Sequence, residues 1–178
     1  MILGGLPRLH LDRTGVALLG AIAIVGAEVM TPEDAARAIH LPTILLLFSF
    51  MVISAQMRLG GFYGAVTRRI AALPVGPAAL MGVVIAVSAV LSAVFSNDIV
   101  CLAVAPVLAE ACMRRRLDPV PFLLGLACAS NIGSAATLIG NPQNMLIGEV
   151  LKMPFAGYAQ EAIGPVVAGL PALWALLA

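Results

Sequence analysis

The chain has 178 residues, of which 61% are hydrophobic and 11% are charged, and its mean hydropathy is +1.05. A soluble domain carries about 25% charged residues, so this composition excludes an ordinary soluble globular fold. It predicts an all-α polytopic membrane protein, because helices satisfy their own backbone hydrogen bonds in lipid. The formal net charge is +1, and no basic run is paired with aromatic residues, which argues against nucleic acid as a partner.

Four stretches are long and apolar enough to be predicted membrane spans. In chain order they are 14–30, 41–57, 120–150 and 162–178. A fifth apolar region, 77–113, is interrupted at its centre by the sequence FSNDIV. The interruption predicts either a re-entrant hairpin or two full crossings, and both place the basic ends of the region on the same side.

The distribution of basic residues predicts the orientation of these spans. The segment 58–76 carries Arg68 and Arg69 and is predicted to form an interfacial helix along the membrane surface. If residues 1–13 are cytoplasmic, eight of the ten Lys and Arg side chains lie on the cytoplasmic side. The positive-inside rule therefore predicts a multi-pass protein of the bacterial cytoplasmic (inner) membrane with a cytoplasmic N-terminal segment.

The first polar interruption contains Asp98, the only charged residue between Arg69 and Glu110. A carboxylate at membrane depth costs about 2.5–3.5 kcal/mol and usually faces a cavity, a partner or an ion. Ser96, Asn97 and Asp98 are also favourable turn residues. A simple aspartate in a water-exposed loop between two crossings is therefore the alternative to a functional carboxylate.

The second polar interruption lies within an uncharged run, 119–148. As one helix this run would be about 45 Å long at 1.5 Å per residue, longer than the hydrocarbon core of about 30 Å. Gly140 and Pro142 predict a break, because proline cannot donate to the helix ladder, and Asn141 is biased away from helical geometry. Broken backbone in lipid is tolerated where it lines a cavity in the protein, and it offers carbonyl oxygens to a cation and helix N-termini to an anion.

Polar side chains around this break add neutral oxygens and amide donors. Such ligands suit Na⁺ or a partly dehydrated anion better than a transition metal. The residues are Ser130, Asn131, Thr137, Asn141 and Asn144. The sequence SNIGSAAT could instead be a packing face, because small and hydroxyl residues also let membrane helices approach closely.

Together, FSNDIVCLAVAPV and ASNIGSAATLIGNPQNMLIG resemble the ion transporter superfamily of citrate-type and divalent anion/sodium symporters and arsenite-efflux permeases. LIGNPQNMLIG is most similar to its bacterial anion-permease branch. The resemblance implies two inverted repeats, each with a re-entrant hairpin and a discontinuous transmembrane helix. The chain resembles one repeat, a single transmembrane domain over 1–178 with a hairpin at 77–113 and a broken helix at 120–150. The expected partners are the lipid bilayer, a small anionic solute, and a second transporter half or a homodimer.

The resemblance also implies roles for individual residues. Ser96 and Asn97 match the hairpin tip that holds sodium and the substrate carboxylate in dicarboxylate symporters. Asp98 replaces a threonine of that branch, looks more like the arsenite-permease branch, and is assigned to cation coupling. The cation-coupling set is Ser96, Asp98, Ser130, Asn131 and Gly133, and a Na⁺ site would comprise Ser96, Asn97, Asn131 and Gly133. The solute-binding set is Asn97, Thr137, Gly140, Asn141 and Asn144.

The expected function is secondary active transport of an anion or oxyanion, of carboxylate or arsenite type, coupled to Na⁺ or H⁺ by alternating access. No enzymatic activity is expected, because no His, Lys or paired carboxylate lies at either interruption. No cofactor is expected apart from the coupling ion. A passive anion or solute channel and a non-transporting membrane subunit are the alternatives.

Overall fold

The computed structural model describes residues 13–178, which divide into two compact units that are considered separately. The first unit ends at Pro42 and contains α1 (Arg13–Gly26) and α2 (Pro32–Arg37). The predicted span 14–30 is wrong at its C-terminal end, because α1 stops at Gly26 and Glu28 adopts a left-handed φ of 57°. At 1.5 Å per residue α1 is about 21 Å long, shorter than a hydrocarbon core of about 30 Å.

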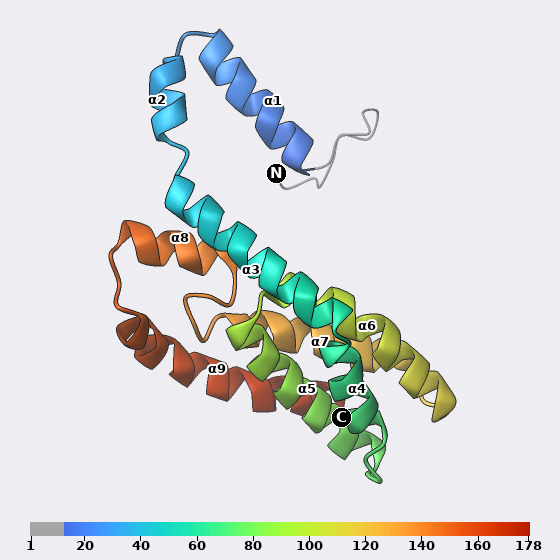
Figure 1. Ribbon diagram of the computed structural model, residues 1–178. Helices are drawn as coiled ribbons and strands as arrows, with labels where there is room; N and C mark the ends of the chain where they lie inside the picture. The colour runs from blue at the N-terminus through green and yellow to red at the C-terminus, as the bar shows by residue number, and fades with distance from the viewer. Residues whose placement is uncertain (1–12) are drawn as a thin grey trace. The chain divides into compact units, whose positions relative to one another are not determined.

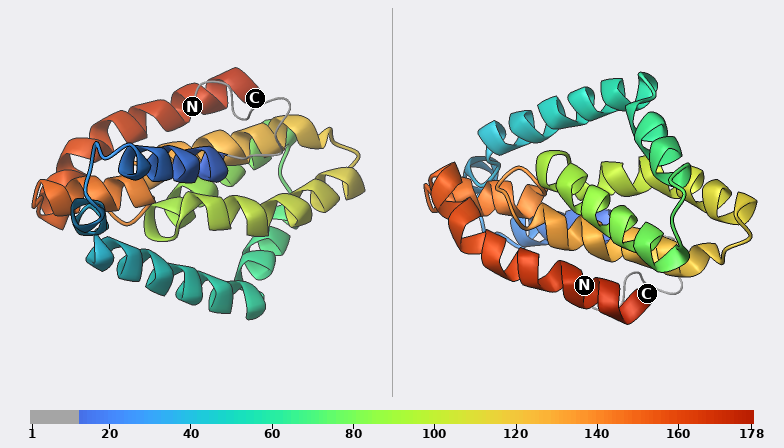
Figure 2. Two further views of the ribbon diagram at one scale, coloured as in Figure 1. Left: turned by 90° about the horizontal axis from the view of Figure 1, so that it is seen from above. Right: turned by 90° about the horizontal axis from the view of Figure 1, so that it is seen from below.

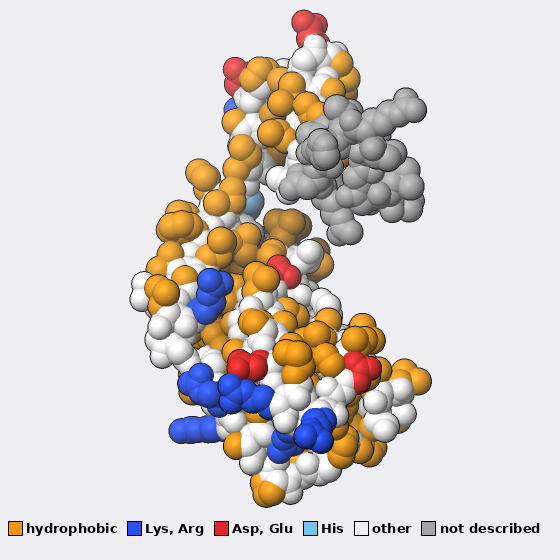
Figure 3. All heavy atoms as spheres, turned by 90° about the vertical axis from the view of Figure 1, so that its right-hand side faces the viewer, with side chains coloured by type: hydrophobic (Ala, Val, Ile, Leu, Met, Phe, Trp, Pro, Cys, Tyr) orange, Lys and Arg blue, Asp and Glu red, His pale blue; other side chains and the backbone are white. Residues whose placement is uncertain are grey.

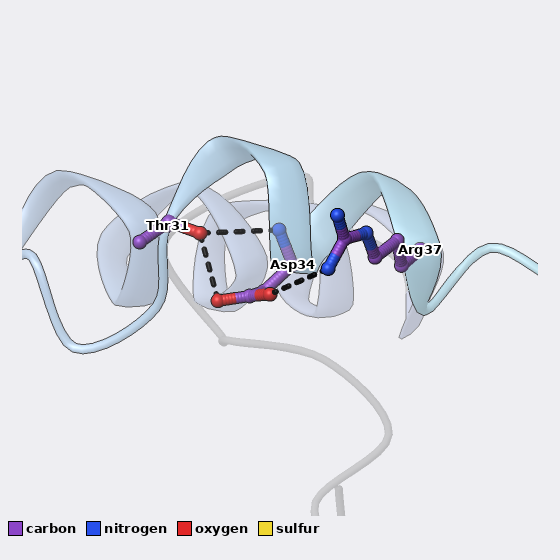
Figure 4. A network of polar contacts seen from close by, with 3 residues as sticks. All are labelled: Thr31, Asp34 and Arg37. Carbon is purple, nitrogen blue, oxygen red and sulfur yellow. Dashed lines mark hydrogen bonds and ion pairs between the residues drawn. The ribbon is translucent and has the colours of Figure 1, made fainter.

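The short helix α2 is defined by its ends rather than by burial, since none of its residues is buried. The Thr31 hydroxyl accepts a hydrogen bond from the Asp34 backbone N–H at 3.1 Å and donates to Asp34 Oδ2 at 2.8 Å (Figure 4). Pro32 occupies the first turn, and Arg37 in the last turn lies 3.9 Å from Asp34 Oδ1. This exposed ion pair contributes little, so the cap and the proline specify where α2 begins.

The second unit begins at Thr43, within α3. Its helices are α3 (Leu41–Leu59), α4 (Phe62–Ala71), α5 (Pro77–Val94), α6 (Asn97–Arg114), α7 (Pro119–Ser134), α8 (Pro142–Val150) and α9 (Phe155–Leu177) (Figure 1). All regular secondary structure within 13–178 is helical, which agrees with the predicted class. Of these helices α3, α5 and α9 are long and apolar enough to cross a membrane. The last span begins at Phe155 rather than at residue 162, so α9 is longer than predicted.

The core of the second unit is formed by α5, α6 and α7, which lie side by side (Figure 2). Helix α4 packs along α6, and α9 packs on α5 and α7. The core side chains are Tyr63, Leu80, Met81, Val84, Ile85, Val100, Val104, Leu108, Cys112, Phe122, Leu126 and Ala129. Most apolar side chains of α3 and α9 remain exposed, the pattern of helices whose outer faces are solvated by lipid.

Small residues bring α5 and α7 into close contact. A Cβ atom on Gly133 of α7 would lie 2.3 Å from both Cα and O of Ala89 on α5. Ala89, Ala129 and Ser130 are all buried. The alternative reading of SNIGSAAT as a packing face is therefore correct for Ser130 and Gly133, which lie at this contact or buried beside it.

Helix α4 departs from the prediction of a helix lying on the membrane surface. Its apolar face packs on protein: Tyr63 and Thr67 are buried, and the Tyr63 ring lies edge-on to Phe95 with centroids 6.0 Å apart. At the other end of α4, the loop carbonyl of Leu73 accepts a hydrogen bond from the Arg115 guanidinium. Helix α4 thus runs alongside the α5–α6 pair, from the turn between these helices to the basic C-terminal end of α6.

Candidate solute and ion site

The two predicted interruptions both form breaks in helices, and the breaks contact each other. Helix α5 ends at Val94 and α6 begins at Asn97, while α7 ends at Ser134 and α8 begins at Pro142. The Asn97 backbone N–H donates to the Gly140 carbonyl at 3.3 Å, and Asn97 Nδ2 donates to Asn131 Oδ1 at 2.9 Å. Thr137 Oγ1 donates to the Ala93 carbonyl in the other direction. Segments far apart in sequence are therefore joined by hydrogen bonds at one place.

The α7–α8 break is closed by polar side chains from within the same segment. Asn141 is the N-cap of α8, and its Oδ1 accepts from the Asn144 backbone N–H at 2.8 Å. The buried Asn144 amide donates to the Ser134 carbonyl at 3.1 Å and to the Thr137 carbonyl at 3.0 Å. Asn141 Nδ2 reaches the Ser134 hydroxyl at 3.3 Å. These amides supply the donors that the helix ladder loses where it stops.

Several carbonyl oxygens of the break already accept hydrogen bonds, and whether they also hold a cation stays a prediction. The carbonyls of Asn131, Gly133, Ser134, Thr137 and Gly140 each accept a hydrogen bond from the protein. The physical reason is that a buried carbonyl without a donor costs about 1–3 kcal/mol. The polar residues of SNIGSAATLIGNPQN thus first stabilise the broken backbone.

Ser130 and Asn131 lie on the last turns of α7, facing α6. The buried Ser130 hydroxyl donates to the Ala127 carbonyl at 3.0 Å and lies 2.9 Å from the sulfur of Cys101. Asn131 is exposed, and its Nδ2 donates to the same Ala127 carbonyl at 3.0 Å. The Asn131 side chain therefore links α7 to the first residue of α6, and its Oδ1 is already occupied by Asn97.

The two glycines assigned to the site are required by close approach of backbone. A Cβ atom on Gly140 would lie 2.1 Å from the Ser134 carbonyl oxygen, because residues 135–141 fold back over the end of α7. Gly133 meets Ala89 in the same way. Neither residue has a positive φ. Both glycines thus have a packing reason independent of any ligand.

Ser96 and Asp98 face a cavity of about 560 Å³ beside the breaks. Its walls come from α3, from the start of α6 and from the start of α8. They are Leu47, Phe50, Met51, Ser54, Ala55, Arg58, Leu59, Ser96, Asp98, Ile99, Leu102, Pro142 and Met145. Asp98 is exposed and belongs to the first turn of α6, so it is not the residue of a free loop. Asn97, Asn131, Thr137, Gly140, Asn141 and Asn144 contact one another around the breaks rather than lining this cavity.

The charges around the cavity can accommodate both an anion and a cation. Helices α6 and α8 both begin at its wall, and each helix N-terminus carries about +0.5 elementary charge. Arg58 on α3 adds a full positive charge, and Asp98 provides the single carboxylate among the lining residues. The Ser96 hydroxyl makes no capping hydrogen bond. An anion can thus be held by Arg58 and the helix N-termini, and a cation by Asp98 and Ser96.

Sequence reasoning missed Arg58 and Ser92. Arg58 belongs to the segment 58–76 that predicts the membrane orientation, yet it is the one basic residue of the cavity wall. The signal was an arginine at the end of an otherwise uncharged apolar helix. Ser92 on α5 is fully buried, and its hydroxyl has no hydrogen-bond partner among the described residues. Nothing in the sequence separated Ser92 from Ser88, because both fit a helix-packing role.

Comparison with known proteins identifies similar sequences over most of the chain. Residues 1–178 match the citrate transporter family (CitMHS). The chain is 37% identical to the silicon efflux transporter LSI3 of Oryza sativa over 92% of this chain and 34% of the relative. It is 30% identical to the putative transporter arsB of Dictyostelium discoideum (91% and 29% covered), and 33% identical to the uncharacterized transporter Rv2684 of Mycobacterium tuberculosis (94% and 40%). The chain thus spans about a third of the length of these relatives. No solved structure matches it significantly.

Proposed function

The chain belongs to the citrate transporter family, and we propose that it forms half of a secondary active transporter that moves an anion or oxyanion by alternating access, coupled to Na⁺ or H⁺. The named relatives are transporters, which agrees with the prediction that the protein is not an enzyme. The observation that carries the proposal is the cavity at the two breaks, where Arg58, Asp98 and two helix N-termini meet. The names of the relatives, a silicon exporter and an arsB-like transporter, favour an oxyanion-type solute.

The positions of the breaks support a re-entrant α5–α6 hairpin. The start of α7 follows the basic end of α6, and α7 extends about 24 Å to its break at 1.5 Å per residue. Helix α8 adds about 13 Å, so the two helices together are long enough to cross a core of about 30 Å once. Because the α5–α6 turn bonds Gly140 in this break, we propose that the turn lies within the bilayer and not in an outer loop.

Within this arrangement, each charged or polar group has a separate task. Arg58 and the α6 and α8 N-termini attract the anionic solute into the cavity. Asp98 and Ser96 hold the coupling ion, because a carboxylate repels an anion and favours Na⁺ or H⁺. Asn97 and Asn131 join the two breaks, and we propose that they hold the α5–α6 turn in place against the end of α7 while the solute passes. Direct solute contacts by Asn97, Thr137, Gly140, Asn141 and Asn144 stay predictions. The same holds for a Na⁺ site at Ser96, Asn97, Asn131 and Gly133, and for the part of Ser130 in cation coupling.

The remaining features of the proposal concern the whole transporter. The family resemblance and the one-third coverage of the relatives favour a second half related by inverted repeat, or a homodimer, that completes the site. The basic ends of α4 and α6 and residues 1–13 are proposed to be cytoplasmic. Residues 1–12 lie outside the described residues. The bacterial inner membrane is the proposed location.

The test is solute flux into proteoliposomes that contain the full-length protein carrying this chain. Citrate, arsenite and silicic acid are offered with an imposed Na⁺ gradient, a pH gradient or neither. We expect accumulation of one solute against its gradient, and we expect Asp98→Asn to change the Na⁺ or pH dependence without preventing membrane insertion. Glu110→Gln is the matched control, because Glu110 lies at the far end of α6 and pairs with Arg114.

Two outcomes would contradict the proposal in different ways. Downhill flux that ignores both gradients would indicate a passive channel. Absence of flux for every solute, with correctly inserted protein, would favour a non-transporting membrane subunit. An unchanged ion dependence in Asp98→Asn, with active uptake intact, would remove Asp98 from the coupling site while leaving the transport function in place.

A further inference from the structure

A second cavity lies at the basic ends of α4 and α6, away from the helix breaks. It measures about 420 Å³ and is lined by Arg68, Arg114 and Arg115, by Glu110, and by the small apolar side chains Ala71, Ala72, Val107 and Ala111. Figure 3 shows Lys and Arg side chains gathered on one part of the surface. We propose that this cavity binds the headgroup of an anionic phospholipid.

The charges around this cavity are unbalanced. Arg69 on α4 and Arg116 after α6 adjoin the three lining arginines in sequence and are exposed. The two nearby carboxylates are already engaged: Glu110 lies 2.7 Å from Arg114 Nη2, and Asp118 caps the Val120 N–H at 3.0 Å. Arg68, which lines the cavity, makes no ion pair within the described part of the chain. A phosphate that contacts Arg68 would therefore displace no existing partner.

Interactions within the protein explain some of these arginines but not all of them. Arginines at a helix C-terminus interact favourably with the helix dipole, which carries about −0.5 charge there. One arginine at each end would satisfy that need. The Arg115 guanidinium also donates a hydrogen bond to the Leu73 carbonyl, and this bond holds the α4–α5 loop against the end of α6. Arg68 and Arg114 remain to face a ligand between the two helix ends.

The depth of the cavity in the bilayer selects a lipid over a soluble anion. The single tryptophan, Trp174 on α9, donates its indole N–H to the Ala78 carbonyl at 2.8 Å and is exposed at the start of α5. Tryptophan side chains are enriched at the membrane–water interface. Ala78 follows the loop that Arg115 contacts, so the arginines and the indole lie at one end of α5. The alanine and valine side chains then offer an apolar wall beside the charges, which suits a lipid and not a free ion.

The experiment uses Trp174 as the probe. The purified chain is reconstituted in phosphatidylcholine vesicles that contain a brominated lipid. This lipid is either phosphatidylglycerol or phosphatidylcholine, in both cases with brominated acyl chains. Quenching of Trp174 fluorescence by the two brominated lipids is compared at equal mole fractions. We expect the brominated phosphatidylglycerol to quench preferentially. Because each basic residue at the surface contributes about fivefold to association with anionic lipid, Arg68→Gln with Arg114→Gln, which changes two lining arginines, should lower that preference about 25-fold. Arg68→Lys with Arg114→Lys should retain most of it.

The control variant carries Arg37→Gln and Lys152→Gln, which remove the same charge elsewhere. Equal quenching by both lipids in the unmodified chain would overturn the proposal. The proposal would also fail if the control variant lost the preference for phosphatidylglycerol as much as the glutamine variant, because the attraction would then be diffuse. Competition by millimolar inorganic phosphate would assign the cavity to a soluble anion instead. Circular dichroism checks that each variant keeps its helical content. If the glutamine variant loses helix, Arg68→Gln alone, with its exposed side chain, decides the question by the same comparison.

Discussion

Replacing Gly133 with alanine tests whether the contact between α5 and α7 sets the geometry of the breaks. The added Cβ would lie 2.3 Å from Cα and O of Ala89, whereas ordinary contacts begin at 3.4 Å. The helices must therefore separate by about 1.1 Å, a gap that forfeits a quarter to a half of the dispersion energy at each affected contact. Overpacking of this kind costs about 1–3 kcal/mol. The backbone of Ala89 cannot move aside as a flexible side chain could, so we expect about 3 kcal/mol.

The assay is thermal unfolding of the purified chain in detergent, followed by circular dichroism. For a chain of this size about 1 kcal/mol corresponds to a shift of about 2–4 °C, so Gly133→Ala should lower the midpoint by about 6–12 °C. Gly164→Ala on α9 is the matched control, because nothing lies within 4 Å of its added Cβ. It should leave the midpoint equal or higher, since alanine favours a helix.

The identity of the clashing atoms sharpens this test. Because both atoms belong to the Ala89 backbone, adding Ala89→Gly to Gly133→Ala should not restore the midpoint. Restoration would mean that the side chain of Ala89, and not its backbone, limits the approach. A Gly133→Ala midpoint equal to that of the unmodified chain would refute the close contact itself.

Three further predictions follow from the hydrogen bonds and charges at the breaks. Asn144→Ala leaves the buried Ser134 carbonyl without its donor, whereas the Thr137 carbonyl keeps the Gly140 N–H at 3.4 Å. The change should cost about 1–3 kcal/mol, while the exposed Gln143→Ala should be nearly neutral. Equal unfolding midpoints for the two variants would contradict the closure of the break. Ser92→Ala removes a buried hydroxyl without a partner among the described residues and should leave the free energy of unfolding equal or higher. Ser134→Ala removes a hydrogen-bonded hydroxyl and should lower the free energy of unfolding by about 1 kcal/mol. A chemical unfolding experiment in which Ser92→Ala is the less stable variant would contradict these hydrogen-bond assignments. Arg58→Gln in the full-length protein should raise the KM for the anionic solute at least tenfold with a smaller effect on kcat, and an unchanged KM in proteoliposome uptake would exclude Arg58 from the solute path.

Local sequence identified both helix breaks, for reasons that act within a few residues. Pro142 cannot donate to a helix ladder, and Asn141 before it adopts the extended backbone of an N-cap. The start of α6 at Asn97 likewise lies inside the predicted interruption 95–100. Helix ends far from such residues were less well predicted. Helix α9 extends seven residues further toward the N-terminus than the apolar window that predicted it, because residues 155–161 continue the helix although Gln160 and Glu161 interrupt the apolar run.

The tasks of the site residues could not be read from sequence, because they depend on which groups meet. Asparagine is equally suited to bind a solute, hold an ion or satisfy a carbonyl. Only the fold places the Asn144 amide on the carbonyls of Ser134 and Thr137, and places Arg58 on the wall that Asp98 shares. Arg58 and Asp98 are forty residues apart, and no periodicity relates them.

The sequence by itself determined that this chain is a helical membrane protein, where its helices break, and which transporter family it belongs to. These properties follow from composition, from proline and glycine, and from motifs of contiguous residues. The tertiary structure decided that the two breaks contact each other, that the asparagines close the backbone, and that a cavity with one arginine and one aspartate lies beside them. The physical reason is that a helix break requires donors and acceptors from elsewhere in the fold, and only packing determines which side chains provide them.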